Sequence, residues 1–91
     1  MYIRVTRASY DATAEAEVNR MVKGELIPAL QKLPGFRHYH GGLDRRSHRL
    51  VAISIWDTEE HSQAIGPRRT GFEALGVKFD AAETFEVTET V

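Results

Sequence analysis

Hydrophobic and polar residues follow a two-residue period in several stretches of the chain, which is the pattern of β-strands. In the first stretch, Ile3 and Val5 fall on one side and Arg4 on the other. Two later stretches are separated by polar residues near 43–47 that are typical of a hairpin turn. Strands are therefore predicted at residues 2–9, 36–42, 49–57 and 83–91.

Two helices are predicted between these strands. Over residues 14–31 the apolar positions recur every three or four residues, as on an amphipathic helix. Gly24 and Pro28 interrupt that run, and because proline removes a backbone hydrogen bond, either a kink or an early last turn is expected. Thr58 predicts the cap of a second helix, which the run at residues 66–71 breaks.

The order strand, helix, strand, strand, helix, strand predicts an α+β, ferredoxin-like βαββαβ fold, with a four-stranded antiparallel sheet and two helices on one face. The third strand carries apolar or small residues on both sides over residues 50–56. Two helices cover only one face, so the face of either Ile53 or Ala52 needs another cover. A second copy of the chain is predicted to supply it, forming a homodimer.

Composition narrows the class of protein. Ninety-one residues are enough for one domain, predicted to span 1–91. A net charge of -1 provides no positive field for nucleic acid, so no such partner is expected. No stretch approaches the roughly 20 apolar residues of a membrane helix, and no secretory signal opens the chain. Because the chain has no cysteine, a cytoplasmic setting is predicted.

Three short motifs carry a resemblance that spans nearly the whole chain: Leu33–Phe36, Trp56–His61 and Phe85–Val87. With these spacings the sequence resembles the antibiotic biosynthesis monooxygenase family of the dimeric α+β barrel superfamily. The resemblance implies a dimeric α+β barrel that oxidises aromatic polyketides or quinols with molecular oxygen. It also implies that the substrate supplies the electrons, so no cofactor and no metal are expected.

Departures from the family pattern leave two functions open. The resemblance implies a pocket lined by an asparagine on the third strand, a tryptophan at its end and a tyrosine early in the second helix. Trp56 matches the tryptophan, but Ala52 and Ser62 stand at the other two positions. A sister branch degrades haem with a histidine late in that helix, and none follows His61. The chain is thus either a cofactor-independent monooxygenase or a non-catalytic small-molecule-binding protein.

His38, His40 and Arg4 are the predicted catalytic residues. The two histidines lie two positions apart on one strand, so they share a face, and histidine exchanges protons near neutral pH. Alternatively, such a pair packs against a partner subunit, and two histidines are too few for a catalytic metal site. The guanidinium of Arg4 would pair with a substrate carboxylate or enolate, although a neighbouring glutamate would serve equally well.

The predicted pocket depends on the register of the hairpin, because a one-residue slip reverses every side chain. A two-residue turn at Arg45 and Arg46 would place the two histidines away from Trp56, whereas the alternative register would join them. The residues predicted to bind substrate are Trp56, Thr6, Tyr39, His61 and Arg68.

Overall fold

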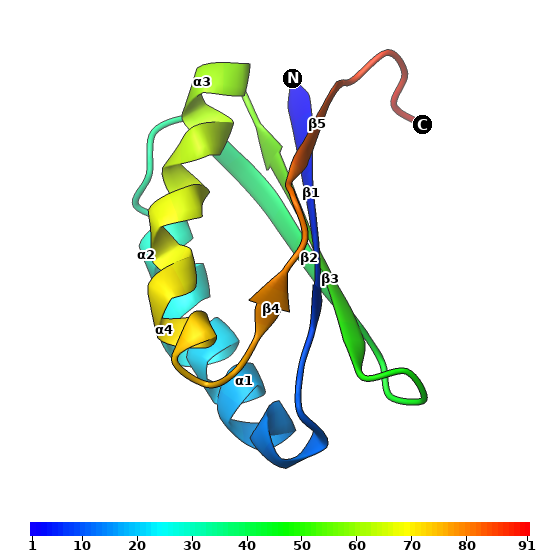
Figure 1. Ribbon diagram of the computed structural model, residues 1–91. Coiled ribbons are helices and arrows are strands. Elements are labelled where there is room, and N and C mark those ends of the chain that lie inside the picture. The colour runs from blue at the N-terminus through cyan, green and yellow to red at the C-terminus, as the bar shows by residue number, and fades with distance from the viewer.

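The computed structural model describes all residues 1–91 as a layer of helices packed on one antiparallel sheet (Figure 1). The strands are β1 (Tyr2–Ser9), β2 (Phe36–Asp44), β3 (Arg49–Trp56), β4 (Lys78–Phe79) and β5 (Glu83–Glu86). The helices are α1 (Glu15–Met21), α2 (Ile27–Leu30), α3 (Glu59–Ser62) and α4 (Thr70–Glu73). A 3-10 turn, Ala12–Ala14, precedes α1, a π-helical turn, Val22–Leu26, joins α1 to α2, and a 3-10 helix, Gln63–Arg69, joins α3 to α4. This order confirms the predicted ferredoxin-like fold.

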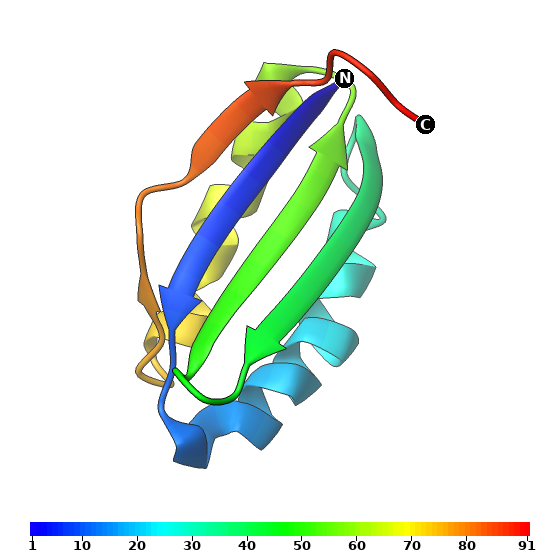
Figure 2. The same cartoon turned by 90° about the vertical axis from the view of Figure 1, so that its right-hand side faces the viewer.

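The sheet has the strand order β2-β3-β1-β4, and β5 pairs with β1 beside β4. Figure 2 shows the strands in front of the helices, with nothing covering their near face. The strand predicted at 83–91 is present only as β5, and the two-residue strand β4 before it was not predicted, so the sheet has five strands rather than four. The strand is shorter than predicted because pairing ends at Glu86, with one further hydrogen bond from the Val87 amide to the Met1 carbonyl.

The register of β3 assigns each side chain to a face. Ala52 pairs with Thr6 and with Gly41, and these positions face the helices. Ile53 pairs with Val5 and His40, and these positions face away from the helices. The hairpin closes at the Asp44–Arg49 pair, so its loop is longer than a two-residue turn. The apolar residues on both faces of β3 therefore divide between a helix-covered side and an uncovered side.

Where the sequence predicts an interruption of the first helix, the structure has a wide π-helical turn at Val22–Leu26. Val18, Leu26 and Leu30 are buried, and their spacings are multiples of four. On a regular α-helix, each four-residue step drifts by about 40° around the axis. The wider turn offsets this drift, so both halves of the helix face the sheet. Pro28 lies in the first turn of α2, where its missing amide is tolerated.

The first two motifs of the sequence resemblance meet at one end of the sheet. Gly35 has a φ of 76°, and its carbonyl accepts a 2.8 Å hydrogen bond from the Asp57 amide. The ring of Phe36 packs edge-on against Trp56, with 5.4 Å between the ring centroids. The His61 imidazole lies directly against Gly35, where a Cβ would be 2.1 Å from its Nδ1. We call Gly35, Phe36, Trp56, Asp57 and His61 the motif junction.

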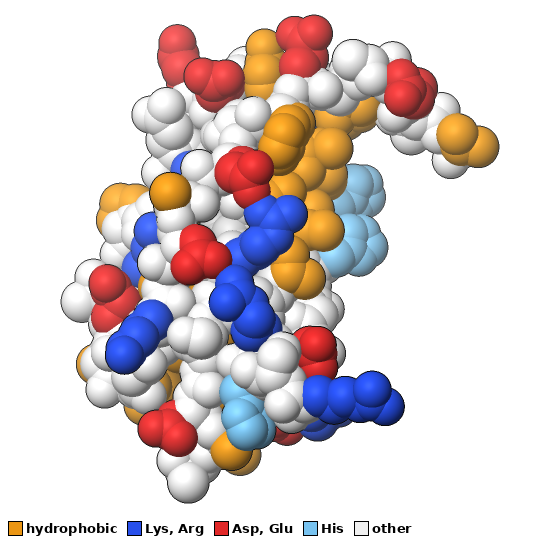
Figure 3. All heavy atoms as spheres, turned by 45° about the vertical axis from the view of Figure 1, so that its right-hand side comes forward, with side chains coloured by type: hydrophobic (Ala, Val, Ile, Leu, Met, Phe, Trp, Pro, Cys, Tyr) orange, Lys and Arg blue, Asp and Glu red, His pale blue; other side chains and the backbone are white.

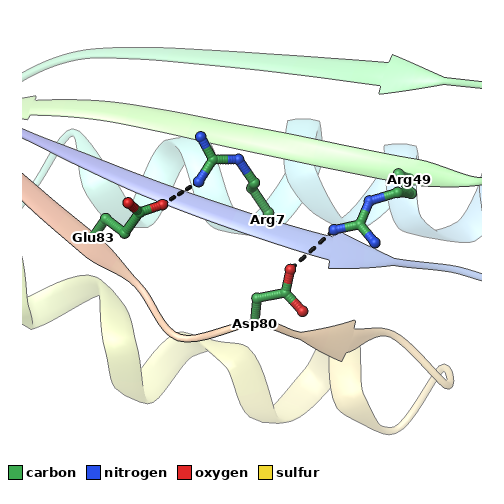
Figure 4. Close-up of polar contacts among 4 residues, drawn as sticks. All are labelled: Arg7, Arg49, Asp80 and Glu83. Carbon is green, nitrogen blue, oxygen red and sulfur yellow. Dashed lines mark hydrogen bonds and ion pairs between the residues drawn. The ribbon is translucent and has the colours of Figure 1, made fainter.

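Ion pairs fasten the end of the chain to the sheet (Figure 4). Arg7 of β1 pairs with Glu83 of β5, and Arg49 of β3 reaches Asp80 at 2.9 Å. The Asp80 amide also donates a 2.8 Å hydrogen bond to the Arg7 carbonyl. These contacts hold the connection between β4 and β5 alongside β1, although no strand pairing links that connection to β1.

The core lies between the helices and the covered face of the sheet. Its buried apolar residues are Ala8, Tyr10, Val18, Leu26, Leu30, Trp56, Phe72 and Val77. The opposite face, which we call the open face, carries Val5, Val51, Ile53, Ile55 and Phe85. Figure 3 shows this apolar surface, with histidine side chains beside it. None of the helices combines the length and the apolar character needed to cross a membrane.

Candidate ligand site between the helices and the sheet

Two small cavities flank Ala52 beneath the helices. Their volumes are about 40 and 50 Å³, and both are lined by Leu26, Ala52, Phe72 and Phe79. The larger cavity is lined only by hydrophobic residues, including Tyr39. The smaller is also lined by Thr6, Ile65, Arg68 and Arg69. The position where the resemblance implies an asparagine is therefore the shared wall of two small cavities.

A groove of about 600 Å³ runs between the two helical arms on the outer side of the smaller cavity. Leu26, Arg68 and Phe72 line both spaces, so these three side chains separate the groove from the interior. The remaining groove residues are Met21, Glu25, Ala29, Leu33, Ala64, Pro67 and Gly71. The groove has the volume of a small-molecule site, whereas each cavity has room for only a few waters and not for an aromatic ring.

Polar groups reach the cavities from both layers. Thr6 of β1 is buried, with 7% of its surface exposed. Burial raises the pKa of Tyr39, because removal from water disfavours the phenolate. Its hydroxyl is therefore protonated at neutral pH, which makes it a hydrogen-bond donor rather than a base. Arg68 and Arg69 come from the helical side.

Trp56 anchors the core and does not line either cavity. It is fully buried, and its Nε1–H donates a 2.8 Å hydrogen bond to Ser54 Oγ. Ser62 is also fully buried, and its hydroxyl donates to the Glu59 carbonyl. The positions that the resemblance assigns to pocket polar groups therefore direct no free polar atom toward the cavities.

Ser54→Ala is expected to lower the free energy of unfolding by about 1–3 kcal/mol, because the buried indole N–H loses its acceptor. Chemical denaturation measures this change. Trp56→Phe removes the donor, so Ser54→Ala should cost much less in that background. An equal cost in both backgrounds would contradict the assigned role of this hydrogen bond.

The predicted histidines lie away from the cavities. His38 and His40 pair with Ile55 and Ile53 on the open face, opposite to Trp56, and both are exposed. His61 belongs to the motif junction, and its buried Nδ1 has no hydrogen-bond partner. The register that remained open in the sequence thus separates the candidate acid–base groups from the candidate pocket within one chain.

Of the predicted site residues, the structure brings together Thr6, Tyr39 and Arg68 around Ala52. Arg4 lies on the helix-facing side of β1, close enough to Arg69 for the charge of Arg69 to contribute to lowering its pKa. Sequence analysis missed Arg69, Phe72 and Phe79 as lining residues. Arg68 and Arg69 could have been recognised in the sequence as a candidate anion-binding pair, because few acidic residues lie near them along the chain. No three His, Asp or Glu side chains come together in a metal-binding cluster.

Similar solved structures define the class of fold. No protein-family model matches the chain, and no curated protein sequence matches it significantly. A candidate antibiotic biosynthesis monooxygenase from Deinococcus radiodurans superposes with a TM-score of 0.80 at 15% identity, covering 100% of this chain and 96% of that one. The ActVA-Orf6 monooxygenase of Streptomyces coelicolor, solved with the ligand nanaomycin D, gives 0.78 at 12% identity, covering 99% and 89%.

A further similar structure is SnoaB, a cofactor-independent oxygenase from Streptomyces nogalater. It superposes with a TM-score of 0.73 at 20% identity, covering 99% of this chain and 95% of that one. The chain thus has the fold of the antibiotic biosynthesis monooxygenases over its whole length. At this level of identity the likeness concerns the fold, and it supports the resemblance inferred from the sequence motifs.

Proposed function

We propose that the protein is a homodimeric, cofactor-independent monooxygenase of the antibiotic biosynthesis type, acting on a small aromatic or quinol-type substrate. The observation that carries this proposal is the groove and cavity system around Ala52, in a fold shared with SnoaB and ActVA-Orf6. Apolar and aromatic walls suit an aromatic ring. Thr6, Tyr39 and the arginines supply the few polar contacts that would orient it.

The proposed chemistry needs an electron-rich substrate anion. For an anthrone, loss of a methylene proton gives an enolate, which Arg68 and Arg69 would stabilise by charge. The enolate passes electrons to O₂, and one C–O bond forms to give a hydroperoxide. Loss of water then leaves a ketone, so one oxygen atom enters the product and the other leaves as water. The substrate supplies all four electrons.

The proposal of a homodimer rests on the apolar side chains of the open face. Phe85 is 48% exposed there, beside the half-buried Val5, Ile53 and Ile55. Figure 2 shows that this face of the sheet lies opposite the helices, and Figure 3 shows apolar side chains gathered in one patch. A second copy of the same face is apolar too, so two-fold packing would bury both. His38 and His40 would then lie at the subunit interface or its rim.

A non-catalytic ligand-binding role is the second candidate, and a specific observation favours it. The Trp56 N–H is already bonded to Ser54, and Ala52 carries no polar group. Tyr39 is protonated, and neither cavity is lined by a carboxylate or a histidine that could remove the substrate proton. The carboxylate of Glu25 lines the groove, but it is exposed and lies 3.7 Å from Arg20. If the protein is a monooxygenase, proton loss from a substrate in the cavities then depends on how far the positive charge of the arginines lowers the pKa of the substrate.

Oxygen uptake with a panel of anthrones and hydroquinones tests the proposal. Ala52→Ile fills the cavity space and is expected to lower kcat/KM at least tenfold. Ala81→Ile adds the same atoms at an exposed loop position and should leave kcat/KM unchanged. Uptake that never exceeds the protein-free rate would overturn the monooxygenase proposal. Saturable binding without uptake would support the non-catalytic role instead.

A further inference from the structure

An arginine on the covered face of the sheet has no partner in the protein. Arg4 pairs in register with Ser54, so its side chain points into the layer between sheet and helices. Its Nε is buried without a hydrogen-bond partner. The other end of the guanidinium reaches the helical layer, where Nη2 would lie 3.7 Å from a Cβ placed on Gly66.

A second arginine approaches from the helical layer. The guanidinium of Arg69 lies over the Phe79 ring, 4.9 Å from its centroid, and its buried Nη2 also has no hydrogen-bond partner. Burial and, to a smaller extent, the charge of Arg69 lower the pKa of Arg4. The two cations therefore lie close enough to repel each other.

No carboxylate of the chain pairs with these groups, and Glu25, which lines the groove with Arg68, lies 3.7 Å from Arg20 instead. Six ion pairs form in the molecule, and none includes Arg4, Arg68 or Arg69. Burying charged donors without partners is costly, and folded proteins seldom tolerate it without a compensating role. Arg69 lines the smaller cavity without an ion-pair partner, and Arg4 lies close to it. Such a pair suits a planar anion, which can accept two parallel hydrogen bonds from one guanidinium.

We propose that Arg4, Arg68 and Arg69 form an anion site that binds the carboxylate of an aromatic acid. The inference names the ligand class of the pocket described above and rests on that pocket being the ligand site. It does not depend on oxygen chemistry. Arg68 and Arg69 line the smaller cavity and would contact the carboxylate, while Arg4 lies beside Arg69 and adds positive potential.

The sizes of the two spaces give the orientation of the ligand. The cavity beside Thr6 and Arg69 has a volume of about 40 Å³, which suits a carboxylate but not a ring. The adjoining groove, at about 600 Å³, has room for two or three fused rings against Leu26 and Phe72. Arg68 lines both spaces, so movement of its side chain would open the connection.

Isothermal titration calorimetry tests the site with 2-naphthoate and its neutral analogue 2-naphthalenemethanol. Wild-type protein should bind the acid at least tenfold more tightly than the alcohol, and Arg69→Met should abolish that preference. Arg46→Met removes an exposed turn arginine that forms no ion pair, and should leave the preference intact. Equal binding of both probes by wild-type protein, or equal loss in Arg46→Met, would overturn the proposal.

Arg4→Met distinguishes a binding arginine from one that only stabilises the fold, because Tm and ligand affinity should change in opposite directions. Because the variant removes a partly buried charge and its repulsion with Arg69, its Tm without ligand should rise, while its affinity for 2-naphthoate falls at least fivefold. A lower Tm with unchanged affinity would contradict the role of Arg4. These binding measurements need no turnover. A protein that shows no oxygen uptake could therefore still have the anion site. Uptake with neutral anthrones, together with no preference for acids in binding, would contradict the anion site but not the monooxygenase proposal.

Discussion

Gly35→Ala is expected to destabilise the protein by about 3 kcal/mol or more, the largest effect expected for any Gly→Ala change in this chain. A φ of 76° costs an L-residue about 1–2 kcal/mol. The new Cβ would also lie 2.1 Å from His61 Nδ1, and overpacking of this kind typically costs a further 1–3 kcal/mol. Urea denaturation of the variant and the wild type measures the sum.

Three comparison variants separate the two causes. Gly76→Ala has a similar φ of 86° but nothing within 4 Å, so it should show the backbone cost alone. His61→Ala should recover the steric part in the Gly35→Ala background, and this gain should be absent beside Gly76→Ala. Gly24→Ala, in the first helix with open space around it, should stabilise by up to about 1 kcal/mol. Equal losses in Gly35→Ala and Gly76→Ala would contradict the contact with His61.

Ile53→Asp should separate the proposed dimer, raising its dissociation constant at least a hundredfold. Ile53 lies on β3, the strand between β1 and β2, and its side chain is on the open face. In the proposed dimer a carboxylate at this position would be buried in the apolar interface with the partner subunit. An unpaired charge there is costly. Sedimentation analysis at micromolar concentration measures the shift from dimer to monomer.

Ala16→Asp is the matched control, because it adds the same charge at an exposed position of α1. It should leave the dimer intact. If Ile53→Asp proves too unstable to purify, Phe85→Ser on the edge of the same face provides a milder test and should weaken association at least tenfold. A wild-type protein that is monomeric at micromolar concentration would refute the proposed packing.

The fold could be predicted from the sequence because its main signals are local. The alternation around Ile3 and Val5 and the cap at Thr58 both predict elements that the structure confirms. The π turn was visible only as an interruption near Gly24, since its cause is the need to align buried residues across the whole helix. The last strand was predicted too long, because alternation continues beyond Glu86 where no neighbouring strand remains.

The site was less predictable, because it depends on register and on distant contacts. Sequence spacing showed that His38 and His40 share a face, but only the paired strands show which face it is. The meeting of Arg4 with Arg69 joins the first strand to the segment before α4, and no local pattern connects them. Conversely, the first two motifs that carried the resemblance predicted the fold well, since they supply the motif junction, and none of its residues lines the cavities.

The position of Trp56 has an optical consequence. It is the only tryptophan, it is wholly shielded from solvent, and it lies outside the cavity walls. Its emission therefore responds to loss of the packing around Phe36 and Gly35, and should change little when a small molecule occupies the groove. The protein carries a built-in fluorophore that distinguishes global unfolding from ligand occupancy in the same cuvette.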